Sequence, residues 1–503
     1  MSEYHTGKLK NDLRIIMNKN SNQTTATVCV FINVGSTSET PQMNGVSHFI
    51  EHLFFKGTKL RPTQKEIAIE FEKYGANANA FTDRELTCYH VKVNADHLEE
   101  IIEILSDILT NSLYKTEDIE MEKNVIINEI HQRNSNQSYL INNTMYEQFF
   151  RGLPISKSVA GRPDIIKKID RAMIMAFLYK FYRPDNMAIS VSGNFKSYDS
   201  MKYLLEKHFG NKFHRNYRID TTLFKRSIEQ LDNYKKQWDN VMGLIPPTYM
   251  QNKILYHITP RTESEHTFVS MAFAGLKFND SNKYKASFLA HILGEGMSSR
   301  LFNKIRSKYG LVYTIKASNN TSDNCGLFRI DYSCNHSFGV QIKILELIKD
   351  EIELLKSQPI TQEEFDNTIS SVENHSKMSQ ENSYENSLHY GMQLLKADKI
   401  KTYKDIVNEY KNISISELQQ FANQLFNWNK FLIVTYSPNK VFIEKYQRIF
   451  LNYQEEQEIK TKSKTKTKST KKSNSRYNSR HKTKTKTKSK TKSKSKSKSK
   501  SKI

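Results

Sequence analysis

The chain has 503 residues, of which 37% are hydrophobic, and carries a formal charge of +23. This length is too great for one small core and suits two domains with additions. No apolar run reaches the length of a membrane span, and the four cysteines lack C-x-x-C spacing, which argues against a membrane protein and a disulfide scaffold. No secretory signal precedes the first predicted strand near Leu13. We therefore expect an intracellular, cytoplasmic protein with reduced thiols.

The first chemical signal along the chain is His48-Phe49-Ile50-Glu51-His52, an H-x-x-E-H pentapeptide. On a helix, His48, Glu51 and His52 share one face and the apolar residues share the opposite face. Two imidazoles one turn apart can ligate a single zinc ion, and the carboxylate between them need not be a ligand. Asn44 is placed to cap this helix. The pentapeptide arises by chance in about a few per cent of chains this long, so it indicates zinc-dependent peptide hydrolysis without deciding it.

A third zinc ligand is predicted in the segment 116–130, which reads as a helix. Its apolar residues surround the axis and predict a largely buried helix: Ile119, Met121, Val125, Ile126, Ile127 and Ile130. Glu122 and Glu129 are seven residues apart and therefore nearly in line. Buried carboxylates are costly unless they are paired or bound to metal. Glu129 as a ligand, with Glu122 as its supporting partner, explains both residues; two ion-paired surface glutamates explain them equally well.

These motifs resemble the pitrilysin or insulinase metallopeptidases, especially mitochondrial processing peptidase and its bacterial relatives. That family places a Glu at a fixed distance after H-x-x-E-H, and the 76 residues between His52 and Glu129 match this distance. The segment 45–58 looks like the family's motif helix, and 78–87 is similar to its substrate-edge strand. The resemblance covers roughly residues 8 to 445.

The resemblance implies one zinc ion per chain, bound by His48, His52 and Glu129, with Glu51 as the general base. It implies a peptide substrate that joins an exposed strand edge at Asn79 and Ala80.

It also implies that Arg306 and Tyr313, within the family-like segment 305–313, stabilise the oxyanion. Without the resemblance, Arg306 is better explained by a surface ion pair and Tyr313 by core packing.

The second half of the chain repeats the first. The segment 25–36 reads like 265–276, since both are period-2 apolar strands that end at a small-residue turn. The motif helix is echoed at 287–292, where Ser287 and Ala290 replace His48 and Glu51 and only His291 remains, as a packing or surface histidine. We predict an α+β fold with two homologous α/β domains, each a mostly antiparallel sheet covered by helices, and a disordered basic tail.

The predicted boundaries follow from this repeat. The catalytic, zinc-binding domain takes residues 1–215, and a polar linker takes 216–250, with a helix at 223–241. The non-catalytic homologous domain takes residues 251–450 and includes a helix after Ser414 and an apolar strand at 431–436.

The positive charge is concentrated after these domains. Residues 460–503 hold 20 of the 76 Lys and Arg residues and no acid, which leaves 56 basic against 53 acidic groups in the rest. The tail alternates Lys with Ser or Thr, so we expect residues 455–503 to be disordered. It is a solvated extension, a contact for nucleic acid or another polyanion, or a targeting address.

The expected function is a zinc metalloendopeptidase that cleaves peptides or unfolded segments. In the family four such domains enclose a chamber and this chain supplies two, which implies a homodimer or a heterodimer with a paralogue, without membrane contact. One alternative is a non-catalytic scaffold subunit, although such relatives lose the ligands that residues 48–52 retain. The other is a polyanion-associated protein, which the nearly neutral body disfavours.

Overall fold

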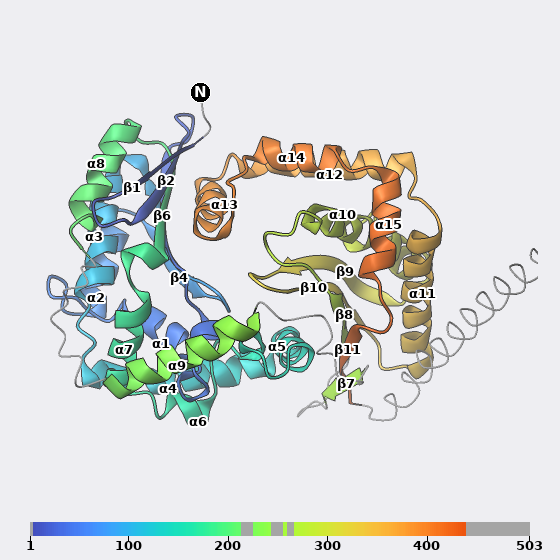
Figure 1. The fold of residues 1–503 in the computed structure, drawn as a ribbon, viewed down its shortest axis with the longest axis horizontal. Coiled ribbons are helices and arrows are strands. Elements are labelled where there is room, and N and C mark those ends of the chain that lie inside the picture. Colours follow the sequence, from blue (N-terminus) through green and yellow to red (C-terminus); the bar gives the residue numbers. More distant parts are fainter. Residues whose placement is uncertain (1–3, 213–224, 243–254, 259–265, 439–503) are drawn as a thin grey trace, which may run out of the picture. The chain divides into compact units, whose positions relative to one another are not determined.

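The computed structural model describes residues 4–212, 225–242, 255–258 and 266–438. The tail with its predicted disorder and parts of the predicted linker lie outside these residues. The described chain forms two β-sheets with their covering helices, one sheet from residues 5–193 and one from residues 255–436 (Figure 1). Among the described residues, no helix combines the length and apolar character that crossing a membrane requires.

The first sheet has six strands in the order β1-β2-β6-β3-β5-β4. Only the β2–β6 pair is parallel. The edge strand β4 contains Asn79 and Ala80, as the sequence predicted. The strands are β1 (His5–Lys8), β2 (Arg14–Lys19), β3 (Thr25–Ile32), β4 (Asn77–Thr82), β5 (Thr87–Asn94) and β6 (Met187–Gly193).

The second sheet has five strands in the order β7-β11-β8-β10-β9, with only the β7–β11 pair parallel. This order repeats β2-β6-β3-β5-β4 strand for strand, so β8 corresponds to β3 and the edge strand β9 corresponds to β4. The predicted α+β fold with two repeated, mostly antiparallel sheets is confirmed. The strands are β7 (Leu255–Ile258), β8 (Thr267–Ala274), β9 (Val312–Thr321), β10 (Gly326–Cys334) and β11 (Phe431–Tyr436).

The helices before β7, with the exception of α5, contribute to the core on one face of the first sheet. Val28 and Val30 of β3 pack in one core with Phe49 and Ile50 of α1, and Leu231 of α9 joins the same core. The helix predicted at 223–241 is therefore present and packs with the first sheet. The helices before β7 are α1 (Val46–Leu53), α2 (Gln64–Lys73), α3 (Leu98–Asn111), α4 (Thr116–Ser135), α5 (Gln137–Phe149), α6 (Pro163–Ile166), α7 (Arg171–Phe181), α8 (Tyr198–Phe209) and α9 (Lys225–Met242).

Apart from α13, the helical elements after β8 pack around α10 and η8, which contact the second sheet at β9. The last of them begins with a capping box between Ser414 and Glu417 and buries Leu418 and Phe421, as its sequence predicted. The helical elements are α10 (Lys283–Gly294), the π-helical turn η8 (Phe302–Lys308), α11 (Phe338–Ser357), α12 (Gln362–Ser379), α13 (Ser383–Lys396), α14 (Tyr403–Lys411) and α15 (Ile415–Leu425).

Two helices pack on the sheet of the opposite sequence half. Helix α13 lies against β2, β3 and β6, and a Cβ at Gly391 would be only 2.1 Å from the ring of Phe31, so this close crossing depends on glycine. Helix α5 lies against β8 and β11, where Ile141 and Met145 pack with Leu432 and Val434. Each sheet is thereby buried on both faces.

Helix α4 is buried on one side only, and the prediction of a largely buried helix was wrong. Ile126 and Ile130 face the core, whereas Met121 and Val125 are 61% and 48% exposed. The sequence has apolar residues all round the helix axis, but other parts of the protein pack against only one side of the helix. The buried side is the one that carries Glu122.

Candidate metal centre

Helix α1 is short and contains the whole pentapeptide, and one of its faces is packed in the core. Phe49, Ile50 and Leu53 are buried in the core, which leaves Glu51 and His52 partly exposed on the other face. The helix starts at Gly45, whose φ of +99° is costly for residues with a side chain.

The start of α1 corrects one prediction, because Asn44 does not cap the helix. The buried carboxylate of Glu39 accepts hydrogen bonds from the backbone N–H of Gly45 at 2.7 Å and of Ser47 at 2.8 Å. The side chain of Asn44 donates to the same carboxylate at 2.9 Å. A carboxylate at this position also complements the helix dipole. Glu39 precedes the helix by several residues, so local capping rules do not reveal it.

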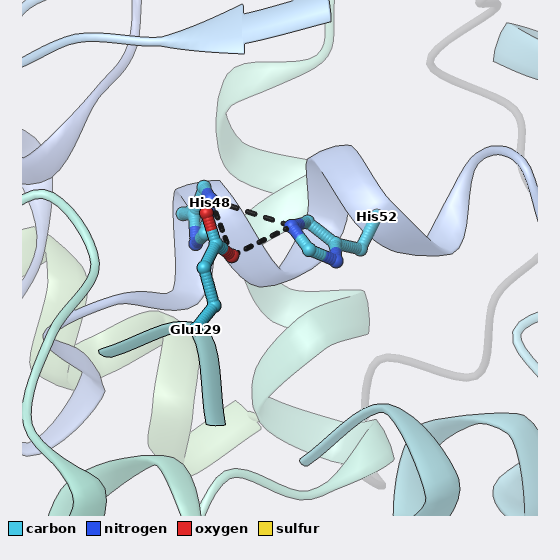
Figure 2. A group of neighbouring side chains, drawn as sticks. All are labelled: His48, His52 and Glu129. Carbon is cyan, nitrogen blue, oxygen red and sulfur yellow. Dashed lines mark hydrogen bonds and ion pairs between the residues drawn. The ribbon is translucent and has the colours of Figure 1, made fainter. Parts of the chain in front are cut away.

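Three predicted ligands converge at one point (Figure 2). The Nε2 atoms of His48 and His52 are 3.3 Å apart, and Oε2 of Glu129 lies 3.6 Å from the first and 3.5 Å from the second. Tetrahedral ligands about 2.0–2.1 Å from zinc are separated by about 3.3–3.4 Å. The three distances therefore fit a tetrahedral zinc site, and no other such group of His, Cys, Asp and Glu occurs among the described residues.

The hydrogen bonding of Glu129 supports the same conclusion. Its Oε2 atom is buried and, within the described part of the chain, has no hydrogen-bond partner. A buried carboxylate oxygen without a partner is costly, and a cation between it and the two imidazoles would remove that cost. Interaction with His52 and the nearby charge of Arg133 outweigh burial and lower the pKa of Glu129 to about 2, so the carboxylate is ionised.

Glu122 supports the site from behind His52. His52 Nδ1 donates to Glu122 Oε1 at 2.8 Å, and Lys56 Nζ lies 2.5 Å from Glu122 Oε2. Burial opposes a charged imidazole, but the hydrogen bond to Glu122 and the attraction of the Glu129 carboxylate raise the pKa of His52 to about 9. Burial, together with the adjacent His52, lowers the pKa of His48 to about 3. The hydrogen bond at Nδ1 leaves Nε2 of His52 facing His48 and Glu129, the other two predicted ligands.

Glu51 lies beside the ligands and is bound to the edge strand. Thr82 Oγ1 of β4 donates to Glu51 Oε2 at 2.6 Å. Burial raises the pKa of Glu51, and the Thr82 hydrogen bond opposes that change. A cavity of about 310 Å³ opens next to it, and its walls are formed by Glu51, His52, Phe55, Lys56, Gln64, Ala78, Asn79, Ala80 and Glu122.

The predicted residues of the second half are not brought to this cluster. The guanidinium of Arg306 lies 5.3 Å from the ring centroid of Tyr313, which is 76% exposed. In the described chain, no hydrogen bond or ion pair joins either side chain to His48, His52 or Glu129. The echo residue His291 pairs with Glu295 at 3.2 Å, away from the metal group.

Lys56, Thr82 and Arg133 were missed by sequence reasoning. Arg133 could have been found, because it follows Glu129 by four residues on one helix and contacts its carboxylate at 2.5 Å. Thr82 reaches Glu51 from another element, and only the folded structure shows this contact.

Comparison with known proteins gives consistent results. The chain is 27% identical to the "Uncharacterized zinc protease YmxG" of Bacillus subtilis over 417 residues, 83% of this chain and 94% of that protein. It is 35% identical to the mitochondrial-processing peptidase subunit beta of Caenorhabditis elegans over 206 residues, 41% of this chain and 44% of that one. A crystal structure of a protease from Helicobacter pylori has the same fold, with a TM-score of 0.74 at 21% identity, covering 86% of this chain and 99% of the other.

Two family models match adjacent parts of the chain. Residues 14–162 match the insulinase model of peptidase family M16, which includes the whole His48–His52–Glu129 group. Residues 168–372 match the model described as the peptidase M16 inactive domain. The second match covers the echo of the motif helix, in which Ser287 and Ala290 stand where the first copy has His48 and Glu51. The chain therefore belongs to the insulinase family of peptidases, M16, as its sequence motifs indicated.

Proposed function

We propose that this protein is a zinc-dependent endopeptidase that hydrolyses peptides or unfolded protein segments. The observation that carries the proposal is the convergence of two imidazole nitrogens and one unpartnered carboxylate oxygen at tetrahedral spacing. Glu51 lies at the adjacent cavity, where a general base is needed.

The residues of the site would have different roles in hydrolysis. His48, His52 and Glu129 would hold zinc, which when bound lowers the pKa of water to about 7 and polarises a carbonyl. Thr82 binds Oε2 of Glu51, which leaves Oε1 to take a proton from the attacking water. Glu51 then transfers this proton to the nitrogen of the leaving amine, so the base returns to its ionised form.

The edge strand β4 offers the substrate a backbone partner. One side of β4 pairs with β5, and Ala78, Asn79 and Ala80 form a wall of the cavity beside Glu51. A peptide that added a strand there would be held through its main chain and would bring a scissile bond to the base. We propose Asn79 and Ala80 as substrate-binding residues on this ground. The oxyanion role of Arg306 and Tyr313 stays a prediction from the family resemblance.

The division of labour between the halves is part of the proposal. Residues 1–215 would form the catalytic domain and residues 251–450 a non-catalytic one, joined by residues 216–250. A subunit beta among the relatives supports a second chain as partner, either another copy or a paralogue. The polyanion contact of residues 460–503 lies outside the described residues and stays a prediction. The scaffold alternative is disfavoured by the intact ligand group.

Metal content and cleavage test the proposal together. The parent protein should bind one zinc ion per chain and cleave a quenched, unstructured peptide, and a chelator should abolish cleavage until zinc is restored. His52→Ala should lose both properties, whereas the echo variant His291→Ala should keep both. Equal zinc content in His52→Ala and the parent would contradict the assigned site.

A further inference from the structure

We propose that Arg133 is a positioning residue that holds Glu129 so that one carboxylate oxygen, and not two, faces the imidazoles. This inference rests on the proposed zinc site. Arg133 Nη2 lies 2.5 Å from Oε1 of Glu129, while Oε2 of the same carboxylate points to His48 and His52 at 3.6 Å and 3.5 Å. The two oxygens therefore have separate partners.

Arg133 is itself held in place from the next helix. Its guanidinium carbon lies 5.7 Å from the ring centroid of Tyr139, near the start of α5. The side chain of Asn136, between the two helices, accepts a hydrogen bond from the backbone N–H of Tyr139 at 3.0 Å. Tyr139 belongs to α5, whose Ile141 and Met145 pack in one core with Leu432 and Val434 of β11.

Orientation explains an arginine here better than metal affinity does. A positive charge next to a ligand repels a divalent cation, so Arg133 should weaken zinc binding through its charge alone. A carboxylate that uses one oxygen, however, leaves a position for the attacking water, which a second oxygen would occupy. A planar guanidinium can fix the orientation of a carboxylate, whereas an ammonium acts mainly as a point charge.

The test compares full-length variants loaded with cobalt(II), whose visible absorption is strong with four ligands and weak with five. Arg133→Met removes the donor and the charge but keeps the length of the side chain. Arg133→Lys is the conservative variant. Lys123→Met is the matched control, because Lys123 pairs with Glu120 on the same helix and does not contact Glu129. Arg133 is 36% exposed, so its replacement should not prevent folding, which the melting temperature will show.

We expect the cobalt absorption of Arg133→Met to fall well below that of the parent, with the kcat for peptide cleavage about 10- to 100-fold lower and KM unchanged. Arg133→Lys should recover part of both signals, and Lys123→Met should match the parent. A parent-like cobalt spectrum in Arg133→Met would overturn the inference while leaving the zinc site intact. If the parent protein binds no cobalt or zinc, the proposed function fails first, and the inference fails with it.

Discussion

His52 is the residue whose surroundings define the site most completely. Its two ring nitrogens have different neighbours, Glu122 at Nδ1, and His48 and Glu129 at Nε2. A carboxylate behind a ligand imidazole fixes the ring orientation and makes the free nitrogen more basic. Glu122 is therefore expected to act through His52 and not by contact with the metal.

Replacing Glu122 by Gln should weaken zinc binding by about 10- to 100-fold, since an amide accepts a weaker hydrogen bond from His52 and loses the ion pair with Lys56. A competition titration with a chelating dye measures this affinity. Glu120→Gln is the control, because Glu120 lies on the same helix in an exposed ion pair with Lys123. Equal affinities of the two variants would show that Glu122 does not support the ligand.

Local spacing explains which site residues the sequence could predict. His48, Glu51 and His52 fall on one helix face by periodicity alone, and Glu129 follows from the family distance. Glu39 and Thr82 belong to other segments, and their contacts with α1 depend on how a loop and a strand pack around it. No pattern within the sequence measures that packing.

At the scale of elements, the first turn of α1 depends on Glu39. Its carboxylate satisfies two backbone N–H groups that would otherwise be buried without partners. Burial raises the pKa of Glu39, although the hydrogen bonds from Gly45 and Ser47 act to lower it. His48, a proposed ligand, directly follows Ser47 in this turn.

Glu39→Gln should lower the free energy of unfolding of the metal-free protein by about 1–3 kcal/mol, because the amide NH₂ would face a backbone donor in a buried site. Urea denaturation measures the change. The control is Glu66→Gln in the exposed capping box of α2, where water can replace the lost bond and the cost should stay below about 1 kcal/mol. A smaller loss for Glu39→Gln than for Glu66→Gln would contradict this role.

The positions of many strands and helices could be predicted, because the spacing of apolar residues within a short segment depends on that segment alone. The apolar run 431–436 became β11, and the two repeated segments contain β3 and β8. Local periodicity did not predict that α5 packs on the second sheet and α13 on the first. An amphipathic helix shows which face it buries, but not which of two similar sheets it buries that face against.

At the scale of the whole described chain, a charged contact joins the two sequence halves. Glu85 lies in the turn after β4, and it accepts from the backbone N–H of Asp323, in the turn after β9, at 3.0 Å. Lys396 at the end of α13 lies 3.3 Å from Glu85 and 2.8 Å from Asp323. The corresponding turns of the two sheets thus meet at one lysine.

This contact should make stability depend on pH. Burial raises the pKa of Glu85 to about 7. Repulsion from Asp323 also raises this pKa, whereas attraction to Lys396 lowers it. The thiol of Cys325 is a further titratable group next to Glu85. Between about pH 4.3, the unfolded value, and pH 7 the folded protein binds the extra proton, so the free energy of unfolding falls as pH rises through this range.

Glu85→Gln should remove roughly 1–3 kcal/mol of that fall. Thermal or urea unfolding of the metal-free protein across this pH range measures it, with the exposed Glu99→Gln as control. A slope in Glu85→Gln equal to that of the parent would show that Glu85 does not titrate as described.

The family resemblance further predicts that the active species contains two chains, since one chain supplies two of four domains. Sedimentation of the zinc-loaded protein during peptide cleavage should show activity in the dimer fraction. A fully active monomer would refute this expectation without affecting the metal site.

Above all, we propose Glu51 as the general base of a zinc peptidase. The most direct measurement is cleavage of a quenched, unstructured peptide by the zinc-loaded parent and by zinc-loaded Glu51→Gln, with zinc content determined in both. We expect equal zinc in the two proteins, cleavage by the parent, and at least a 10²-fold lower rate for the variant, on the order of the general-base contribution. Equal rates at equal zinc content would contradict it.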